Sequence, residues 1–182
     1  MNAFARSLLA SVTVWLLLAT PGLARSEEFD QGQIWLHGNY GLFQDFSHDG
    51  RQLHLVSIGG EYVLARNFSM GLEATGYYAD LQRENPKGQG VGLTARWAFL
   101  RIGRAVLFLD GGVSAATFDE HVPPGGSHSN FVERIGPGLA VRLTDSLLLT
   151  GGASYLHLSN GRECSNPGLD ALGGHIGLLY AF

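Results

Sequence analysis

The sequence is poor in the residues that build disulfide-rich or nucleic-acid-binding proteins. Its 182 residues include one cysteine, Cys164, so the chain can form no internal disulfide. Charged residues make up 15% of the chain, well below the usual quarter or so, and the formal net charge is −4. An acidic balance without basic clusters argues against a general nucleic-acid binder.

Long apolar runs are absent after residue 24. Before that point, Arg6 precedes a mostly apolar stretch at 8–19, and small residues lead to Ala24. This order is typical of a secretory signal peptide, so we predict that residues 1–24 are a signal peptide cleaved after Ala24. An uncleaved anchor is the alternative, but the run is shorter than the ~20 residues of a membrane-spanning helix. The mature domain, 25–182, then carries 11 Lys and Arg against 16 Asp and Glu, a net charge of −5.

Proline is also scarce, at 6 residues, whereas glycine reaches 26, about twice its average usage. An exported, rather apolar chain without membrane-spanning helices is expected to be a closed barrel. Only closure satisfies the backbone hydrogen bonds of every strand in lipid. The predicted fold is therefore all-β, an eight-stranded antiparallel transmembrane barrel of the outer-membrane type.

Eight segments show the residue alternation of strands: 33–43, 52–64, 69–80, 91–100, 105–118, 130–143, 146–159 and 169–182. Each has about ten residues or more, the length that a tilted strand needs to cross a bilayer. Short connections alternate with longer ones, as they do between the periplasmic turns and external loops of outer-membrane barrels. Both ends of the mature chain are then expected in the periplasm.

The last segment ends in an aromatic residue, Phe182, on an alternating row with Ile176, Leu178 and Tyr180. This ending resembles the assembly signal of bacterial outer-membrane barrels and predicts a bacterial outer-membrane location. The alternative is a buried edge strand in a soluble sandwich.

Alternate positions along a strand point to opposite faces of the sheet, so the alternation assigns each residue to one face. The apolar rows should face lipid, and Arg96, Arg134 and Arg142 should face the lumen beside acids such as Glu61, Glu73 or Asp110. Because eight strands leave an interior filled by side chains, this arrangement argues against a diffusion channel or a lumen-binding transporter.

Three polar residues interrupt the lipid-facing rows at the loop end of the last two strands. His157 and Ser159 are two residues apart, so they point to the same face, and that face also carries Tyr155. Asp170 stands at a lipid-facing position of the final strand and can reach His157 from that neighbouring strand.

Serine, histidine and a carboxylate together suit nucleophilic catalysis. A serine hydroxyl needs a base within hydrogen-bond reach, histidine suits that role, and a carboxylate fixes the histidine tautomer. The spacing His-x-Ser is a weak motif on its own, and polar residues are ordinary at a barrel rim. A non-catalytic structural or adhesive outer-membrane barrel is the alternative, although such a barrel gains nothing from polar groups that face lipid.

The C-terminal segments resemble a known family. His157-Leu158-Ser159-Asn160, then Asn166-Pro167-Gly168-Leu169-Asp170 and a glycine-bearing last strand ending in Phe182, are similar to the C-terminal signature of the lipid A 3-O-deacylase (PagL) family. The resemblance is specific over His157 to Phe182. Elsewhere it rests on size and strand pattern.

The resemblance implies an eight-stranded outer-membrane barrel whose Ser-His-acid site lies on the outer surface. It implies His157 as the base, Ser159 as the nucleophile and Asp170 as the orienting acid, with Asn160 and Asn166 holding the oxyanion or the substrate. The best-known member of the family has glutamate where this chain has Asp170. The shorter side chain puts its reach in doubt, and Glu163 in the loop is the alternative acid.

The expected substrate is lipid A or lipopolysaccharide among outer-membrane lipids, and the reaction needs no cofactor or metal. His48, His121 and His128 lack a metal-ligand constellation and are interpreted as solvated loop residues. The aromatic residues Tyr77, Tyr78 and Tyr155 are interpreted as girdle or packing residues. Cys164 is interpreted as a free loop thiol. Acyl-chain preference and oligomeric state stay open, with a homodimer as one alternative.

Overall fold

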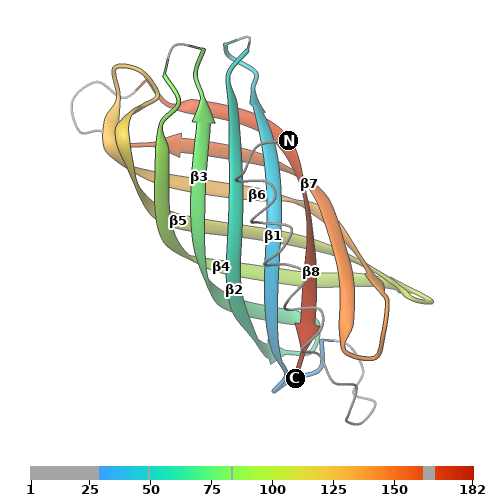
Figure 1. The fold of residues 1–182 in the computed structure, drawn as a ribbon. Coiled ribbons are helices and arrows are strands. Elements are labelled where there is room, and N and C mark those ends of the chain that lie inside the picture. The colour runs from blue at the N-terminus through green and yellow to red at the C-terminus, as the bar shows by residue number, and fades with distance from the viewer. Residues whose placement is uncertain (1–28, 49, 83, 162–166) are drawn as a thin grey trace.

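The computed structural model describes residues 29–182 except 49, 83 and 162–166, and these residues form one closed antiparallel barrel (Figure 1). The strands pair in chain order: β1 (Ile34–Asp45), β2 (Gln52–Ala65), β3 (Phe68–Asp80), β4 (Lys87–Ile102), β5 (Ala105–Val122), β6 (Ser127–Arg142), β7 (Leu147–Ser159) and β8 (Leu169–Ala181). This confirms the predicted fold class. The predicted signal peptide, 1–24, lies outside the described residues. Within them, no helix is long and apolar enough to span a membrane.

Three strands extend further towards the loops than the alternation predicts. β4 begins at Lys87, so Gly88-Gln89-Gly90 belongs to the ladder, and the β5–β6 hairpin continues to Val122 and Ser127. These segments contain Gly, Asp, Ser and His, which favour loops, yet they belong to the strands. Pairing depends on the neighbouring strand, which a local pattern does not contain.

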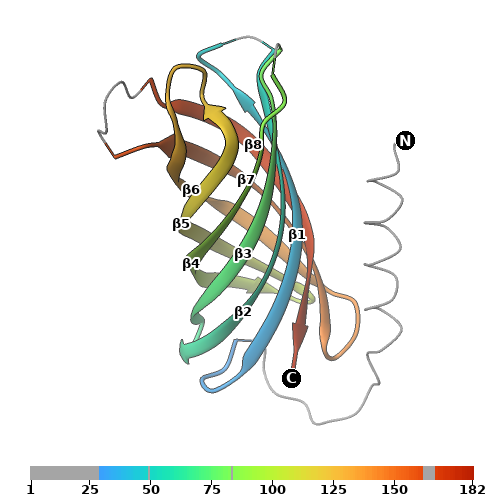
Figure 2. The same ribbon diagram turned by 60° about the vertical axis from the view of Figure 1, so that its left-hand side comes forward.

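Closure places the ends of the described chain at the short-turn end of the barrel. β8 pairs with β1 from Trp35 opposite Ala181 to Asp45 opposite Ala171, and Phe182 N donates to Ile34 O at 3.1 Å. Figure 2 shows β1 and β8 side by side, with the C-terminus at the end of the barrel opposite the long loops. No strand of the described barrel keeps a free edge.

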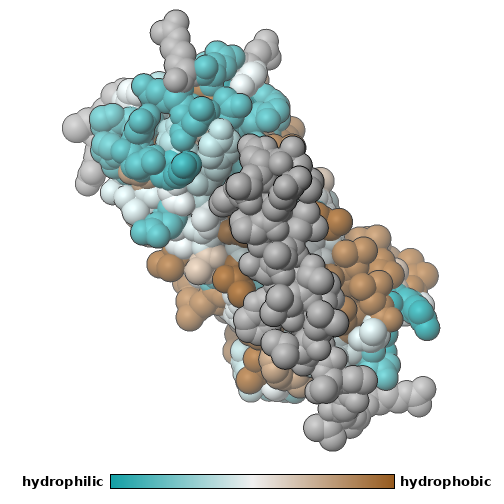
Figure 3. All heavy atoms as spheres, in the orientation of Figure 1, coloured by the Kyte–Doolittle hydropathy of each residue, from teal (hydrophilic) through white to brown (hydrophobic). Residues whose placement is uncertain are grey.

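The two faces of the sheet differ as the parity predicts. Large apolar residues are exposed on the outer face, for example Ile58, Leu72 and Val91 at 59%, 68% and 68%. On the visible face in Figure 3, hydrophilic residues gather at the loop end and hydrophobic residues lie over the part nearer the turns. This distribution suits a bilayer around the barrel wall with the loop end in water and headgroups.

The lumen is packed with side chains in layers. One apolar cluster fills the loop end and contains Phe43, Leu53, Leu156 and Leu158. A second fills the turn end around Trp35 and other residues such as Phe108 and Leu148. Because both ends are filled, the described barrel encloses no open pore, as expected for eight strands.

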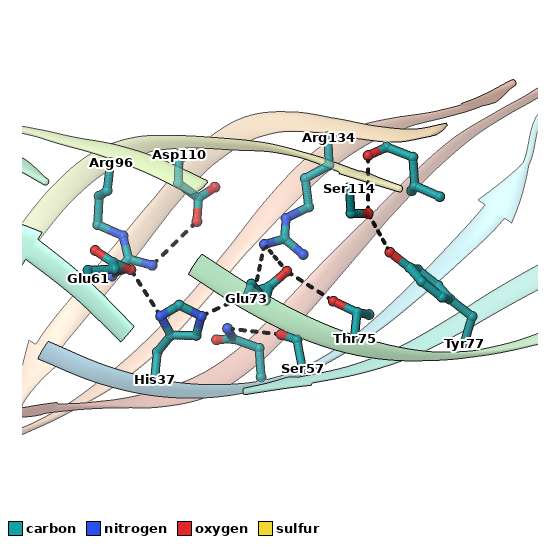
Figure 4. Close-up of polar contacts among 12 residues, drawn as sticks. His37, Ser57, Glu61, Glu73, Thr75, Tyr77, Arg96, Asp110, Ser114 and Arg134 are labelled. Carbon is teal, nitrogen blue, oxygen red and sulfur yellow. Dashed lines mark hydrogen bonds and ion pairs between the residues drawn. The ribbon is translucent and has the colours of Figure 1, made fainter. Parts of the chain in front are cut away.

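A buried ionic network lies between the two apolar clusters (Figure 4). The ring of His37 lies between two carboxylates, with Nδ1 3.2 Å from Glu61 Oε1 and Nε2 3.2 Å from Glu73 Oε2. Arg96 lies 3.2 Å from Glu61 and 3.6 Å from Asp110.

A second arginine completes the network. Both Glu73 oxygens accept from Arg134 Nη2, at 3.1 and 3.2 Å. The predicted lumenal positions of Arg96 and Arg134 and their acidic partners are therefore confirmed. Arg142 is half-buried further along the same row of β6.

Replacing Glu73 by glutamine should destabilise the barrel strongly. The substitution keeps the shape but removes the carboxylate that Arg134 contacts and leaves His37 with Glu61 alone in a buried site. Breaking a buried pair typically costs ~3–5 kcal/mol. Urea unfolding of the refolded protein in lipid vesicles measures the change. Glu120→Gln, at an exposed position on the β5–β6 hairpin, is the matched control. A loss below ~1 kcal/mol for Glu73→Gln, the range of surface ion pairs, would contradict a tightly coupled network.

Candidate active site

The candidate site begins with the alternation of β7. Leu156 and Leu158 are fully buried in the lumenal cluster at the loop end. Their neighbours His157 and Ser159 therefore point to the outer face, where both are half-buried. The outward direction of the predicted histidine and serine follows from this packing.

The neighbouring strand brings the predicted acid to the histidine. Asp170 on β8 is the direct cross-strand partner of His157, and Asp170 Oδ1 lies 2.7 Å from His157 Nδ1. About a third of each side chain is exposed, 33% for His157 and 36% for Asp170. Because the two residues lie directly opposite each other, the shorter aspartate does reach the imidazole. An ionised carboxylate only accepts hydrogen bonds, so this contact assigns the ring hydrogen to Nδ1 and leaves Nε2 as an acceptor.

Tyr155 is a member of the site that the sequence reasoning treated as a girdle aromatic. Its hydroxyl donates to Asp170 Oδ1, the same oxygen that contacts His157. Its ring also lies 6.4 Å from that of Phe46, just beyond the end of β1. The sequence does contain a clue to this role. Tyr155 lies two residues before His157 on the same strand, so both side chains point to the outer face.

Ser159 completes the outward row at the end of β7. Among the described residues its hydroxyl makes no hydrogen bond to His157.

Across the other edge of β7, β6 places Phe131 opposite Ser159 and Glu133 opposite His157. Glu133 is an exposed second carboxylate beside the histidine, which sequence reasoning did not identify because the β6–β7 register is not readable from the pattern.

The remaining predicted residues lie in or beside the β7–β8 loop. Asn160 is buried, at 7% exposure, and lines an open hollow of about 1020 Å³ together with Phe131. His157, Ser159 and Asp170 do not line this hollow. Asn166, Glu163 and Cys164 lie outside the described residues, so their roles stay predictions.

The loop returns to the barrel beside the histidine. Gly168 has a φ of +62°, which favours glycine, and a Cβ atom built there would lie 3.7 Å from His157 Cε1. No cluster of three or more metal-ligating side chains occurs in the part of the chain that the structure describes.

Solved structures with the same fold are outer-membrane barrels. The outer-membrane enzyme PagL aligns with a TM-score of 0.63 and 16% identity over 78% of this chain and 97% of its own. Neisserial surface protein A aligns with a TM-score of 0.61 and 13% identity over 82% and 96%. The N-terminal barrel domain of Pseudomonas aeruginosa OprF aligns with a TM-score of 0.58 and 16% identity over 84% and 98%. At these identities the likeness shows the fold.

A family model gives the more specific result. No curated protein matches the chain. The model of the lipid A 3-O-deacylase (PagL) family, in contrast, matches residues 38–178, which include most of the barrel and the outward row on β7 and β8. The chain is thus a bacterial outer-membrane barrel and belongs to the lipid A 3-O-deacylase (PagL) family.

Proposed function

We propose that this protein hydrolyses the ester-linked acyl chain at the 3-position of lipid A, with Ser159 as nucleophile, His157 as base and Asp170 as orienting acid. The observation that carries the proposal is the 2.7 Å contact between His157 and Asp170 on the outer face. Ser159 lies on the same row at the loop end of β7, the end at which lipid headgroups are expected to meet the barrel wall. Membership of the PagL family supports the substrate class.

The first half of the reaction transfers the acyl group to the protein. His157 Nε2 takes the proton of Ser159 as the hydroxyl oxygen attacks the ester carbonyl, and Asp170 stabilises the imidazolium that forms. The tetrahedral intermediate collapses, the bond to the sugar oxygen breaks, and His157 returns the proton to that oxygen. Ser159 must approach His157 for this step, and such hydrogen bonds are often long until substrate binds.

The second half releases the fatty acid. Water, deprotonated by His157, attacks the acyl-serine carbonyl, and the ester bond to Ser159 breaks with return of the proton to the serine oxygen. The products are a free fatty acid and lipid A with a free 3-hydroxyl group. Asn160 and Asn166 are proposed to stabilise the oxyanion, a role that typically contributes 10²–10³-fold in rate per donor.

Two carboxylates could serve His157, and the contacts favour Asp170. Asp170 meets Nδ1 directly and is held by a second donor, the Tyr155 hydroxyl. Glu133 faces the same histidine from β6 without a hydrogen bond to it among the described residues. A carboxylate that is already positioned needs no reorganisation when charge develops on the imidazole.

Ser159→Ala and His157→Ala should each abolish deacylation while the barrel still folds. The nucleophile and base act as a unit, so loss of either is expected to lower kcat by ~10⁴-fold or more. Both side chains lie at the outer rim, where truncation leaves no core cavity, so stability should change little. Release of fatty acid from purified lipid A measures activity, and heat-modifiable gel mobility checks folding. Wild-type activity in folded Ser159→Ala protein would reject Ser159 as nucleophile and favour the structural-barrel alternative.

Asp170→Ala should lower kcat less than the loss of Ser159 or His157, because an orienting acid contributes less than the groups that transfer the acyl chain and the proton. Asp170→Glu should retain more activity than Asp170→Ala, since it keeps a carboxylate beside His157. The same fatty-acid release assay compares the variants, with Glu133→Gln as a matched carboxylate control. A larger loss in Glu133→Gln than in Asp170→Ala would transfer the orienting role to Glu133.

A further inference from the structure

Phe46, the first residue beyond β1, lies beside the proposed active site. β8 pairs with β1 along one edge and with β7 along the other, so Asp170 lies between Phe46 and His157. The backbone N–H of Phe46 donates to Asp170 O at 3.1 Å, just beyond the last residue pair of β1 and β8. The backbone of the proposed orienting acid is therefore held from both neighbouring strands.

A buried carboxylate fixes the turn that carries Phe46. Asp45 is 3% exposed, and its Oδ1 accepts from the backbone N–H groups of Ser47 at 2.7 Å and His48 at 3.2 Å. An aspartate that binds backbone groups two and three residues further on closes a local turn. The Asp45 N–H also donates to Arg51 O at 3.0 Å, which holds the far side of the loop. Phe46 thus follows a residue whose backbone and side chain are both anchored.

The Phe46 ring packs against the tyrosine that contacts Asp170. The ring centroids of Phe46 and Tyr155 are 6.4 Å apart with an interplanar angle of 36°, within the range of favourable aromatic pairs. The Tyr155 hydroxyl donates to Asp170 Oδ1. Because that hydroxyl is rigidly attached to its ring, the orientation of the ring decides where the hydroxyl points. The Phe46 ring restricts that orientation from the side of β1.

The Asp170 side chain needs such support because 36% of it is exposed. An aspartate on the outer face of a strand can rotate about its side-chain bonds towards water. In the barrel, one oxygen of Asp170 meets both the Tyr155 hydroxyl and His157 Nδ1. A carboxylate held in this way keeps the ring hydrogen of His157 on Nδ1 and leaves Nε2 to act as the base.

We propose that Phe46 and Tyr155 are positioning residues for deacylation, an inference that rests on the proposed deacylase function. Phe46 holds the Tyr155 ring and the backbone of Asp170. The Tyr155 hydroxyl holds the Asp170 carboxylate, which in turn orients His157. Both aromatic residues act through Asp170, so their effects on the reaction should depend on that carboxylate.

Steady-state kinetics of fatty-acid release from lipid A tests this dependence. Tyr155→Phe keeps the ring and removes only the hydroxyl, so kcat should fall about tenfold, the effect of losing one hydrogen bond to a charged group. Phe46→Ala should lower kcat about threefold, as expected for the loss of an aromatic pair. KM should not change in either variant, because positioning of the base is not substrate binding. In Asp170→Ala protein, neither change should lower kcat further.

Two outcomes of the kinetics contradict the inference. A higher KM with unchanged kcat would show that the two aromatic residues bind the lipid and do not position the acid, which overturns it. Losses in kcat that are as large in the Asp170→Ala background as in the wild-type background would show that they act independently of Asp170, which also overturns it.

Matched variants away from the site serve as controls, with heat-modifiable gel mobility to check folding. Tyr78→Phe removes a tyrosine hydroxyl at the loop end of β3. Phe99→Ala removes an exposed phenylalanine near the turn end of β4, whose ring centroid lies 5.7 Å from that of Trp97. Both should leave kcat unchanged. An equal loss of kcat in either control would indicate a general effect on the barrel and would overturn the inference.

A measurement without turnover separates this inference from the proposed function. The mature chain with ¹⁵N-labelled histidine is refolded in detergent micelles, and the Nδ1–H signal of His157, assigned by its loss in His157→Ala, is observed by NMR. Phe46→Ala and Tyr155→Phe should each broaden or remove this signal, because a mobile carboxylate no longer protects the hydrogen from exchange with water. A signal that is absent from the wild-type barrel, or unchanged in both variants, overturns the inference. A wild-type barrel that shows the expected response but releases no fatty acid rejects the deacylase function and still supports the positioning of Asp170.

Discussion

Every feature of this protein depends on the hydrogen-bonded closure of β8 onto β1. An unpaired backbone group in hydrocarbon costs several kcal/mol, so a membrane-embedded sheet must leave no edge. The pairing of β1 with β8, from Trp35 to Asp45, removes both edges that an open sheet of eight strands would keep. The same closure brings β8 beside β1, so that Phe46 N, just beyond the end of β1, donates to Asp170 O at 3.1 Å.

Alternation along each strand then divides polar residues between two environments. Inside the barrel, charges are tolerated only as a network, and His37, Arg96 and Arg134 each face carboxylates there. Outside, isolated polar groups would be costly at mid-membrane but are tolerated at the headgroup level. The outward row His157 and Ser159 lies at the loop end of β7, and the proposed function places the ester of lipid A there.

The proposed site illustrates how a barrel can hold catalytic groups without a cleft. Leu156 and Leu158 anchor β7 in the lumen, and direct pairing with β8 aligns Asp170 with His157. Tyr155 then fixes the carboxylate from a third position. The geometry is set by rigid ladder contacts on neighbouring strands, which hold side chains more accurately than loops do.

The class of fold, the two faces of the sheet and the outward row could be predicted from the sequence, because all three follow from a period of two residues. The sequence predicted Arg96 and Arg134 in the lumen for the same reason. Features that depend on register between strands are visible only in the folded barrel. Asp170 lies directly opposite His157, Tyr155 shares its carboxylate, Glu133 flanks the histidine, and β4, β5 and β6 extend beyond their predicted ends. Alternation fixes the direction of a side chain within its own strand, whereas the side chain opposite it is chosen by pairing and closure of the whole barrel.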